Sequence, residues 1–116
     1  MASLPMLRSR LDFAALQTDA RSRLDPLLVL RYRRNGLDGT RFGISTGRRT
    51  GTAVVRNTIR RRLRRVIVGL LNVIDPGWDV LIIARPAAAQ ATQAELATVF
   101  ERLLRKAGLI APQVAA

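Results

Sequence analysis

The feature that most constrains the fold is a basic stretch spanning residues 39–74. It contains nine arginines and no acidic residue, although the chain carries eight acids in all. Within it, apolar residues recur at helical spacing and form one arc of a helical wheel: Ile59, Leu63, Val66, Ile67 and Leu70. The pattern predicts a long helix from Thr52 or Ala53 to about Asn72, with one face in a core and a cationic face outside.

The cationic face of this predicted helix carries little that could balance its charge. Opposite the apolar arc lie these polar positions: Asn57, Arg61, Arg64, Arg65 and, on a shoulder, Arg62. Arg60 lies at the edge of the arc, where its aliphatic stem can pack while its head reaches solvent. The alternative is a plain solvated face, but such a face normally mixes signs to form ion pairs, and like charges four residues apart cost stability. The pattern therefore favours a polyanionic partner.

Composition agrees with a polyanionic partner. The 116-residue chain has a net charge of +12, and all but one of its twenty basic residues are arginine. Arginine suits bidentate contacts to phosphate and stacking on bases. A GC-rich genome would also favour arginine over lysine, but it would not explain the excess of positive charge. Strong net charge of one sign indicates binding of a polyanion such as nucleic acid.

Several function classes are excluded or disfavoured. Without cysteine or histidine, the chain has no disulfide, no thiolate chemistry, no histidine acid–base catalysis and no ordinary zinc site. No apolar run approaches the roughly 20 residues that span a bilayer, and residues 1–6 lack the apolar stretch of a secretory signal. We expect one cytoplasmic domain covering residues 1–116, with no membrane or small-molecule substrate.

The remaining pattern predicts a single-domain α+β sandwich, with helices packed on a mixed sheet. Residues 11–18 form a short helix with Leu11, Ala15 and Leu16 inward, and residues 92–107 form a last helix that Gly108 ends. Strands are expected at residues 27–33, 41–46 and 78–84, the last buried on both faces. The turn residues between the first two strands favour a hairpin. Residues 112–116 are expected to be a disordered tail.

A glycine-bracketed loop, GRRTG at residues 47–51, precedes the long helix. Glycine permits close backbone approach, and a helix N-terminus offers free N–H groups to an anion. The loop lacks the Gly-Lys-Ser/Thr ending of a nucleotide-binding P-loop.

Three separated segments carry a family resemblance. Residues 41–65, RFGISTGRRTGTAVVRNTIRRRLRR, resemble the signature of the bacterial ribonuclease P protein family: a strand, a basic pair, then Ala-Val-x-Arg-Asn-Arg and a basic helix. Residues 7–13 (LRSRLDF) are similar to its N-terminal Arg-Leu and Asp-Phe pattern, and residues 76–86 (PGWDVLIIARP) to its Pro-Gly-Tyr-Asp and Ile-Ala-Arg-Pro segment. The resemblance covers most of the chain in the right order.

The resemblance implies an αβββαβα-like fold with a left-handed βαβ crossover, which has one strand more than the pattern alone indicates. It implies a subunit that binds the catalytic ribonuclease P RNA and precursor tRNA, assisting endonucleolytic removal of the 5′ leader. The RNA would carry the hydrolysis with Mg²⁺ bound chiefly by RNA and substrate, so this chain would hold no catalytic residue and no metal site. By position, the expected RNA contacts are Arg48, Arg49, Arg56, Asn57, Arg60, Arg61, Arg64 and Arg65.

The family's leader cleft lies between the first helix and the sheet, and this chain departs from its pattern. Phe13 matches one family aromatic, although an ordinary core phenylalanine would look the same. Two other aromatic positions hold Gln17 and Arg31, and Thr58 replaces the last arginine of the Arg-Asn-Arg motif. We therefore expect leader binding to depend less on stacking and more on the charges of Arg31 and Arg33.

Two other function classes remain for a chain of this composition. A ribosomal or ribosome-assembly RNA-binding protein would carry the same charge but not the Ala-Val-Val-Arg-Asn signature. A free-standing nuclease needs several carboxylates at one site, whereas the closest pair, Asp75 and Asp79, is interpreted as turn and strand-cap chemistry. A membrane-surface role is disfavoured because the apolar face of the long helix is needed for the core.

Overall fold

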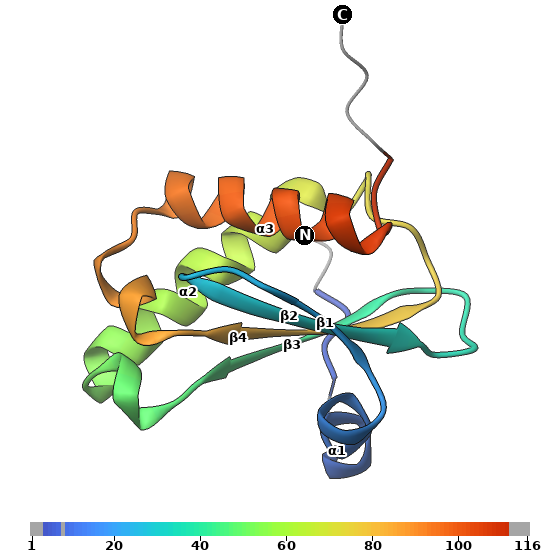
Figure 1. Ribbon diagram of the computed structural model, residues 1–116, viewed down its shortest axis with the longest axis horizontal. Coiled ribbons are helices and arrows are strands. Elements are labelled where there is room, and N and C mark those ends of the chain that lie inside the picture. Colours follow the sequence, from blue (N-terminus) through green and yellow to red (C-terminus); the bar gives the residue numbers. More distant parts are fainter. Residues whose placement is uncertain (1–3, 8, 112–116) are drawn as a thin grey trace, which may run out of the picture.

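A four-stranded mixed sheet forms the centre of the molecule, shown in Figure 1 as a computed structural model that describes residues 4–7 and 9–111. In chain order the elements are α1 (Arg10–Thr18), β1 (Arg21–Leu24), β2 (Leu28–Arg34), β3 (Arg41–Thr46), η1 (Arg48–Thr50), α2 (Ala53–Leu70), β4 (Trp78–Ala84), η2 (Pro86–Gln90) and α3 (Gln93–Ala107). Apart from the two 3₁₀ helices this is the αβββαβα order that the resemblance implies. The predicted α+β class is confirmed.

The sheet order is β1-β2-β4-β3, with β4 antiparallel to β2 and parallel to β3. The predicted hairpin between β2 and β3 is therefore wrong. Its turn does form, since Gly36 has a φ of 71° and the Leu37 N–H donates to Asn35 Oδ1 over 2.7 Å. The chain then crosses to the far edge of the sheet. The reason lies in β4, whose apolar residues point to both faces and favour the position with a strand on each side.

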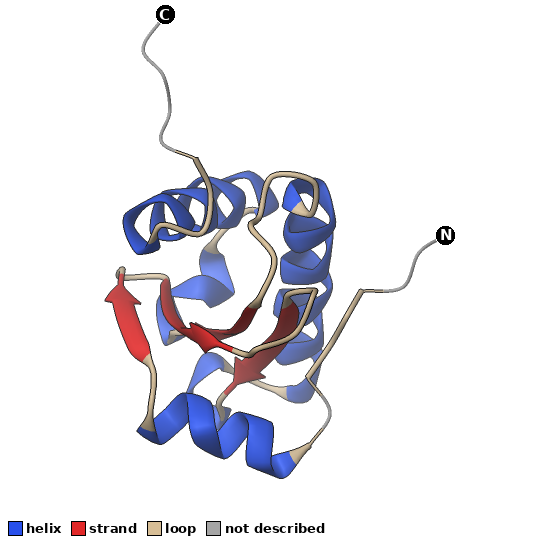
Figure 2. Cartoon of the chain, turned by 90° about the vertical axis from the view of Figure 1, so that its right-hand side faces the viewer, coloured by secondary structure: helices blue, strands red, loops and turns tan. Residues whose placement is uncertain are grey.

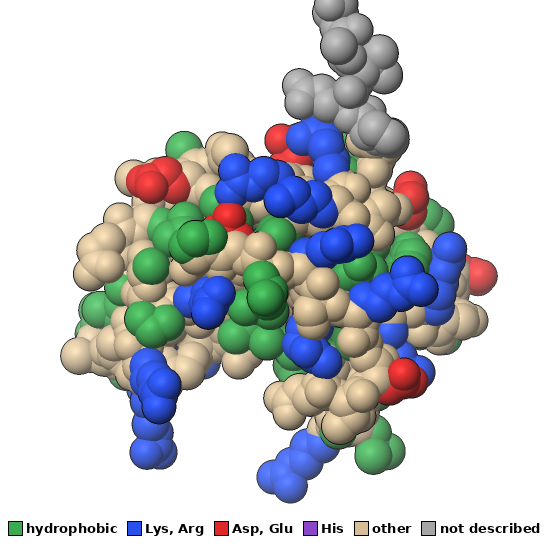
Figure 3. All heavy atoms as spheres, in the orientation of Figure 1, with side chains coloured by type: hydrophobic (Ala, Val, Ile, Leu, Met, Phe, Trp, Pro, Cys, Tyr) green, Lys and Arg blue, Asp and Glu red, His purple; other side chains and the backbone are tan. Residues whose placement is uncertain are grey.

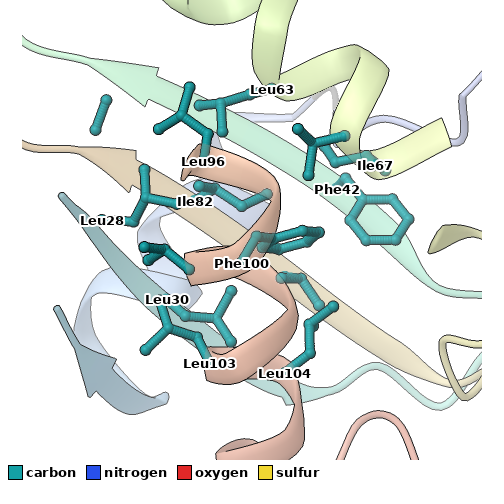
Figure 4. Close-up of a cluster of buried hydrophobic side chains, with 14 of the residues drawn as sticks. Leu28, Leu30, Phe42, Leu63, Ile67, Ile82, Leu96, Phe100, Leu103 and Leu104 are labelled. Atoms are coloured by element: carbon teal, nitrogen blue, oxygen red, sulfur yellow. The ribbon is translucent and has the colours of Figure 1, made fainter. Parts of the chain in front are cut away.

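Helices α2 and α3 cover one face of the sheet, and α1 covers the other (Figures 1 and 2). The larger core lies under α2 and α3, where Phe42 of β3 and Phe100 of α3 are 1% and 0% exposed (Figure 4). The predicted apolar arc of α2 is confirmed, with Leu70 at its end half-buried. Helix α3 begins at a capping box of Thr92 and Glu95, and Gly108 ends it in the left-handed conformation.

A smaller core joins α1 to the opposite face of the sheet. Leu16 of α1 and Leu81 of β4 are buried there, and Phe13 packs beside them. The prediction that Leu11 points inward is wrong, because its side chain is 82% exposed. Phe13 lies directly over Gly43 of β3, where a Cβ atom would be 2.9 Å from the ring atom Cε1. Glycine at this position leaves the space that the ring occupies.

Strand β1 is the element that the sequence pattern did not reveal. Its four residues, Arg-Ser-Arg-Leu, are all exposed and pair with β2 at the sheet edge. A strand with no buried face produces no apolar alternation, so only the family resemblance indicated it. The tail predicted at residues 112–116 lies outside the described residues.

An ionic cluster fastens α1 to the sheet. Arg41 of β3 donates from Nε and Nη2 to both carboxylate oxygens of Asp79 on β4, over 2.9 and 2.7 Å. It also donates to both oxygens of Asp12 on α1, each over 3.3 Å. Asp79 is 5% exposed and accepts a further hydrogen bond from Asn35. The hydrogen bond to Asp79 is the main cause that raises the pKa of Arg41. Asp79 is thus a buried partner of Arg41 rather than a strand cap.

Breaking this cluster from one side should be costly. We expect Arg41→Met to lower the free energy of unfolding by about 3 kcal/mol, because it leaves the buried Asp79 carboxylate without its cation. The double variant Arg41→Met/Asp79→Leu should recover most of that loss, since it removes both charges. Urea denaturation of the two variants measures the difference. An equal loss in both would show that the unpaired carboxylate is not the cause.

Candidate nucleic-acid interface

The surface that the sequence points to begins at η1, directly before α2. Gly51 separates the two elements with a φ of 141°, and a Cβ atom there would lie 2.9 Å from a Val55 methyl group. Thr52 then caps α2, its hydroxyl oxygen accepting the Val55 N–H over 3.4 Å. This local geometry places the exposed side chains of Arg48 and Arg49 next to the N-terminus of α2.

The outward face of α2 is cationic along its length, as predicted. Of the six polar positions on α2 that the resemblance assigns to RNA contacts, all but Arg56 are exposed: Asn57, Arg60, Arg61, Arg64 and Arg65. Arg60 is oriented by its neighbour one turn away, because its Nη1 donates to Asn57 Oδ1 over 3.2 Å. Thr58, which replaces the motif arginine, donates instead to the Val54 carbonyl within the helix. The substitution therefore contributes no group to this face.

The charge of this face is not balanced inside the protein. In the described part of the chain, the ion pairs involve Arg33, Arg41, Arg102 and Arg105, and none involves an arginine of η1 or α2. The acidic residues of the chain all lie outside residues 39–74. Like-charged side chains on one helix face repel one another, and a bound polyanion would turn that cost into a gain.

Arg56 is held differently from its neighbours. The residue is half-buried, and its Nε is buried with no hydrogen-bond partner in the described residues. A buried donor without an acceptor costs free energy. Burial of this kind is invisible on a helical wheel, so the sequence identified Arg56 only through the family motif.

Two arginines of the basic stretch belong to the fold and not to the surface. Arg41 is taken up by the ionic cluster with Asp12 and Asp79. Arg62, which the wheel placed on a shoulder of the polar face, is half-buried, and its Nη1 donates to the Ala91 carbonyl over 2.7 Å. This bond ties α2 to the loop before α3. The cationic face is therefore narrower than the count of arginines suggests.

The three residues predicted for the leader cleft come from α1 and β2; Gln17 and Arg31 meet at the end of α1, whereas Phe13 lies over β3. Gln17 is exposed and Phe13 is half-buried over Gly43. Arg31 donates from Nε to the Leu16 carbonyl, from Nη2 to the Gln17 carbonyl over 3.0 Å, and from Nη1 to Ser22 Oγ over 2.9 Å. It thus caps the last turn of α1. The sequence led us to expect that the charge of Arg31 is available to the leader. Its guanidinium group instead donates hydrogen bonds to Leu16, Gln17 and Ser22 within the protein.

The described residues contain no group of three or more acidic side chains that could hold a metal ion. Asp12 and Asp79 are paired with Arg41, and Asp25 accepts from Arg102 over 2.6 Å. Also within residues 4–7 and 9–111, no helix combines the length and apolar character needed to cross a bilayer.

A small α+β domain that exposes an arginine face without acidic partners beside a helix N-terminus is typical of nucleic-acid-binding proteins. The family model described as Ribonuclease P matches residues 1–108. Proteins named Ribonuclease P protein component are similar to the chain: the one from Roseiflexus castenholzii is 37% identical, covering 90% of this chain and 86% of that protein. The one from Acidothermus cellulolyticus is 41% identical, covering 84% and 83%.

Solved structures support the same family assignment. The RNase P protein of Staphylococcus aureus superposes with a TM-score of 0.85 at 25% identity, covering 94% of this chain and all of that one. The protein from Thermotoga maritima gives a TM-score of 0.78 at 28% identity, covering 86% and 96%. The chain belongs to the ribonuclease P protein family, the protein subunits of a ribonucleoprotein endoribonuclease. These findings favour that family over the ribosomal alternative.

The division between structural and surface arginines can be tested by stability alone. Arg62→Ala should lower the free energy of unfolding by about 1.5 kcal/mol, because the Ala91 carbonyl loses a charged donor at a half-buried site. Arg61→Ala, the adjacent control on the exposed face, should change it by less than about 0.5 kcal/mol. Urea denaturation measures both. Equal losses of stability in the two variants would show that the hydrogen bond from Arg62 to Ala91 does not stabilise the fold.

Proposed function

We propose that the chain is the RNA-binding subunit of ribonuclease P and contacts the catalytic RNA through η1 and α2. The observation that carries this proposal is the exposed arginine face without acidic partners, built from Arg48, Arg49, Arg60, Arg61, Arg64 and Arg65. Guanidinium groups on such a face neutralise phosphates and release their counterions. Arg56 and Asn57 add donors at the start of the helix, close to the anion-binding N-terminus.

The second proposed role is to hold the single-stranded 5′ leader of precursor tRNA on the α1 side of the sheet. Phe13 offers the exposed part of its ring for stacking. Gln17 offers an exposed amide, whereas Arg31 supports the site mainly by fixing the end of α1. The proposed RNA-subunit and leader surfaces thus use helices on opposite faces of the sheet (Figure 2). The same chain could bind both RNAs at once.

The metal ion of the reaction is proposed to belong to the RNA. The carboxylates of Asp12, Asp25 and Asp79 are already paired with arginines, and the described residues hold no group of three acidic side chains for Mg²⁺. Magnesium instead prefers sites with few protein ligands beside phosphate oxygens, which RNA and substrate supply. In this proposal the protein supplies affinity and position, and the location is the cytoplasm, where tRNA precursors are made in bacteria.

Reconstitution with the cognate ribonuclease P RNA is the decisive experiment. The protein alone should cleave nothing, and the complex should release the 5′ leader of precursor tRNA at a Mg²⁺ concentration at which the RNA alone is slow. Gel analysis of end-labelled substrate measures both. Robust cleavage by the RNA-free protein would contradict the proposal, as would a protein that does not bind the RNA.

The salt dependence of RNA-subunit binding tests the arginine face itself. Replacing Arg60 and Arg64 with alanine should reduce the slope of log K against log salt by about one unit for each lost phosphate contact. Lys106→Ala on α3, an exposed cation on another element, should leave the slope unchanged. Filter binding over a range of salt concentrations gives the slopes. Slopes equal to that of the unmodified protein would mean that the face is merely solvated.

A further inference from the structure

Where β2 extends past β1, the sheet edge forms a hollow, and of the residues predicted to contact RNA only Arg33 lines it. Strand β1 begins with Arg21 opposite Tyr32, so the last two residues of β2, Arg33 and Arg34, extend beyond it. The connection between α1 and β1 turns away there and leaves an open hollow of about 610 Å³. We call it the β2-edge hollow; its walls are residues 18–20, Arg21, Tyr32, Arg33, Arg34 and Trp78.

The β2-edge hollow is strongly positive. Three of its residues are arginines and one, Asp19, is acidic. The ion pair of Asp19 with Arg33 is long, at 3.8 Å, and the Asp19 side chain is 84% exposed, so it offsets little of the charge. Arg21 and Arg34 are exposed and form no ion pair within the described residues. Figure 3 shows the face of the molecule seen in Figure 1, on which basic side chains outnumber acidic ones.

An aromatic wall makes the hollow more than a charged patch. The guanidinium carbon of Arg34 lies 4.3 Å from the ring centroid of Trp78, and Tyr32 meets the same ring edge-on at 5.8 Å. The cation–π contact limits the orientations open to Arg34, so a ligand would have less side-chain entropy to remove. A guanidinium held in this way presents its donors to phosphate and its plane to a base.

The backbone adds a donor at the same place. Asn35 donates its N–H to the Gly77 carbonyl on the β4 side of β2. Because successive N–H groups of a strand point to opposite sides, the N–H of Arg34 faces the β2-edge hollow. The hollow therefore combines two uncompensated guanidinium groups, an indole and a backbone donor.

We propose that the β2-edge hollow binds a nucleotide of single-stranded RNA, with its phosphate at Arg21 and Arg34 and its base against the Arg34–Trp78 pair. An aromatic wall and a volume within the range of small-molecule sites fit a nucleotide better than a bare anion. The hollow begins at Thr18, next to Gln17 of the proposed leader cleft. This inference rests on the proposed function, and the nucleotide comes either from the distal leader or from the RNA subunit.

The chain offers a matched control for the test. Arg21 and Arg23 lie on the same exposed strand and carry the same charge, but only Arg21 lines the hollow. We would compare Arg21→Ala and Arg34→Ala with Arg23→Ala in the reconstituted complex, after confirming by thermal unfolding that all three fold. Affinities are measured for the RNA subunit and for precursor tRNAs with a long and a short leader.

Each hollow variant should lose affinity by about tenfold, the effect of one charge-assisted contact, while Arg23→Ala changes little. A loss confined to the long-leader substrate would identify the distal leader as the source, and a loss of RNA-subunit affinity would identify that RNA. Losses no larger than that of Arg23→Ala in all three measurements would overturn the inference. Failure of the unmodified protein to bind the RNA subunit would instead overturn the proposed function.

Trp78 provides a direct readout, because it is the only tryptophan of the chain. Adding a single-stranded RNA oligonucleotide to the protein should change its fluorescence, and Arg23→Ala should respond equally. Unchanged emission at RNA concentrations that saturate binding would overturn the inference.

Discussion

The central position of β4 is the constraint on which the rest of the structure depends. Its residues are buried toward both faces, so one side anchors the core under α2 and α3 while the other anchors α1. The same strand pairs with β2 and β3, and its Asp79 holds Arg41. The arginine face of η1 and α2 and the cleft beside α1 are therefore both positioned by this one strand. A strand with a polar face could not support helices on two sides.

The arginines fall into two groups: some have an ion-pair or hydrogen-bond partner within the described residues that holds the fold together, and others are left exposed to solvent. Arg41 is surrounded by carboxylates, Arg62 reaches a loop carbonyl, and Arg31 caps the end of α1. Along η1 and α2 the other arginines have no such partners in the described residues, since the acids lie on other elements. What remains exposed is a surface whose self-repulsion a phosphate backbone would relieve. Net charge alone would have overestimated it.

Leader recognition in this chain is where the family pattern is least complete. Of the aromatic positions expected beside α1, only Phe13 is kept, and Arg31 gives its donors to the helix end. The only tryptophan lies instead beyond the end of α1, in contact with Arg34 and Tyr32. In the proposal above, the β2-edge hollow would supply stacking and charge beyond the end of α1.

The sequence by itself determined the elements and the direction in which α2 faces. Helical and strand periodicity is local, so the apolar arc of α2 and the buried strand β4 followed from it; Gly108 marked the end of α3, and the family resemblance supplied β1. Only the tertiary structure decided that β4 separates β2 from β3, and that Leu11 is exposed. It also decided which arginines are internal. A helical wheel gives the angle of Arg62 about its axis, but not that the Ala91 carbonyl lies within reach. Strand order and such contacts join residues far apart in the chain, where local pattern carries no information.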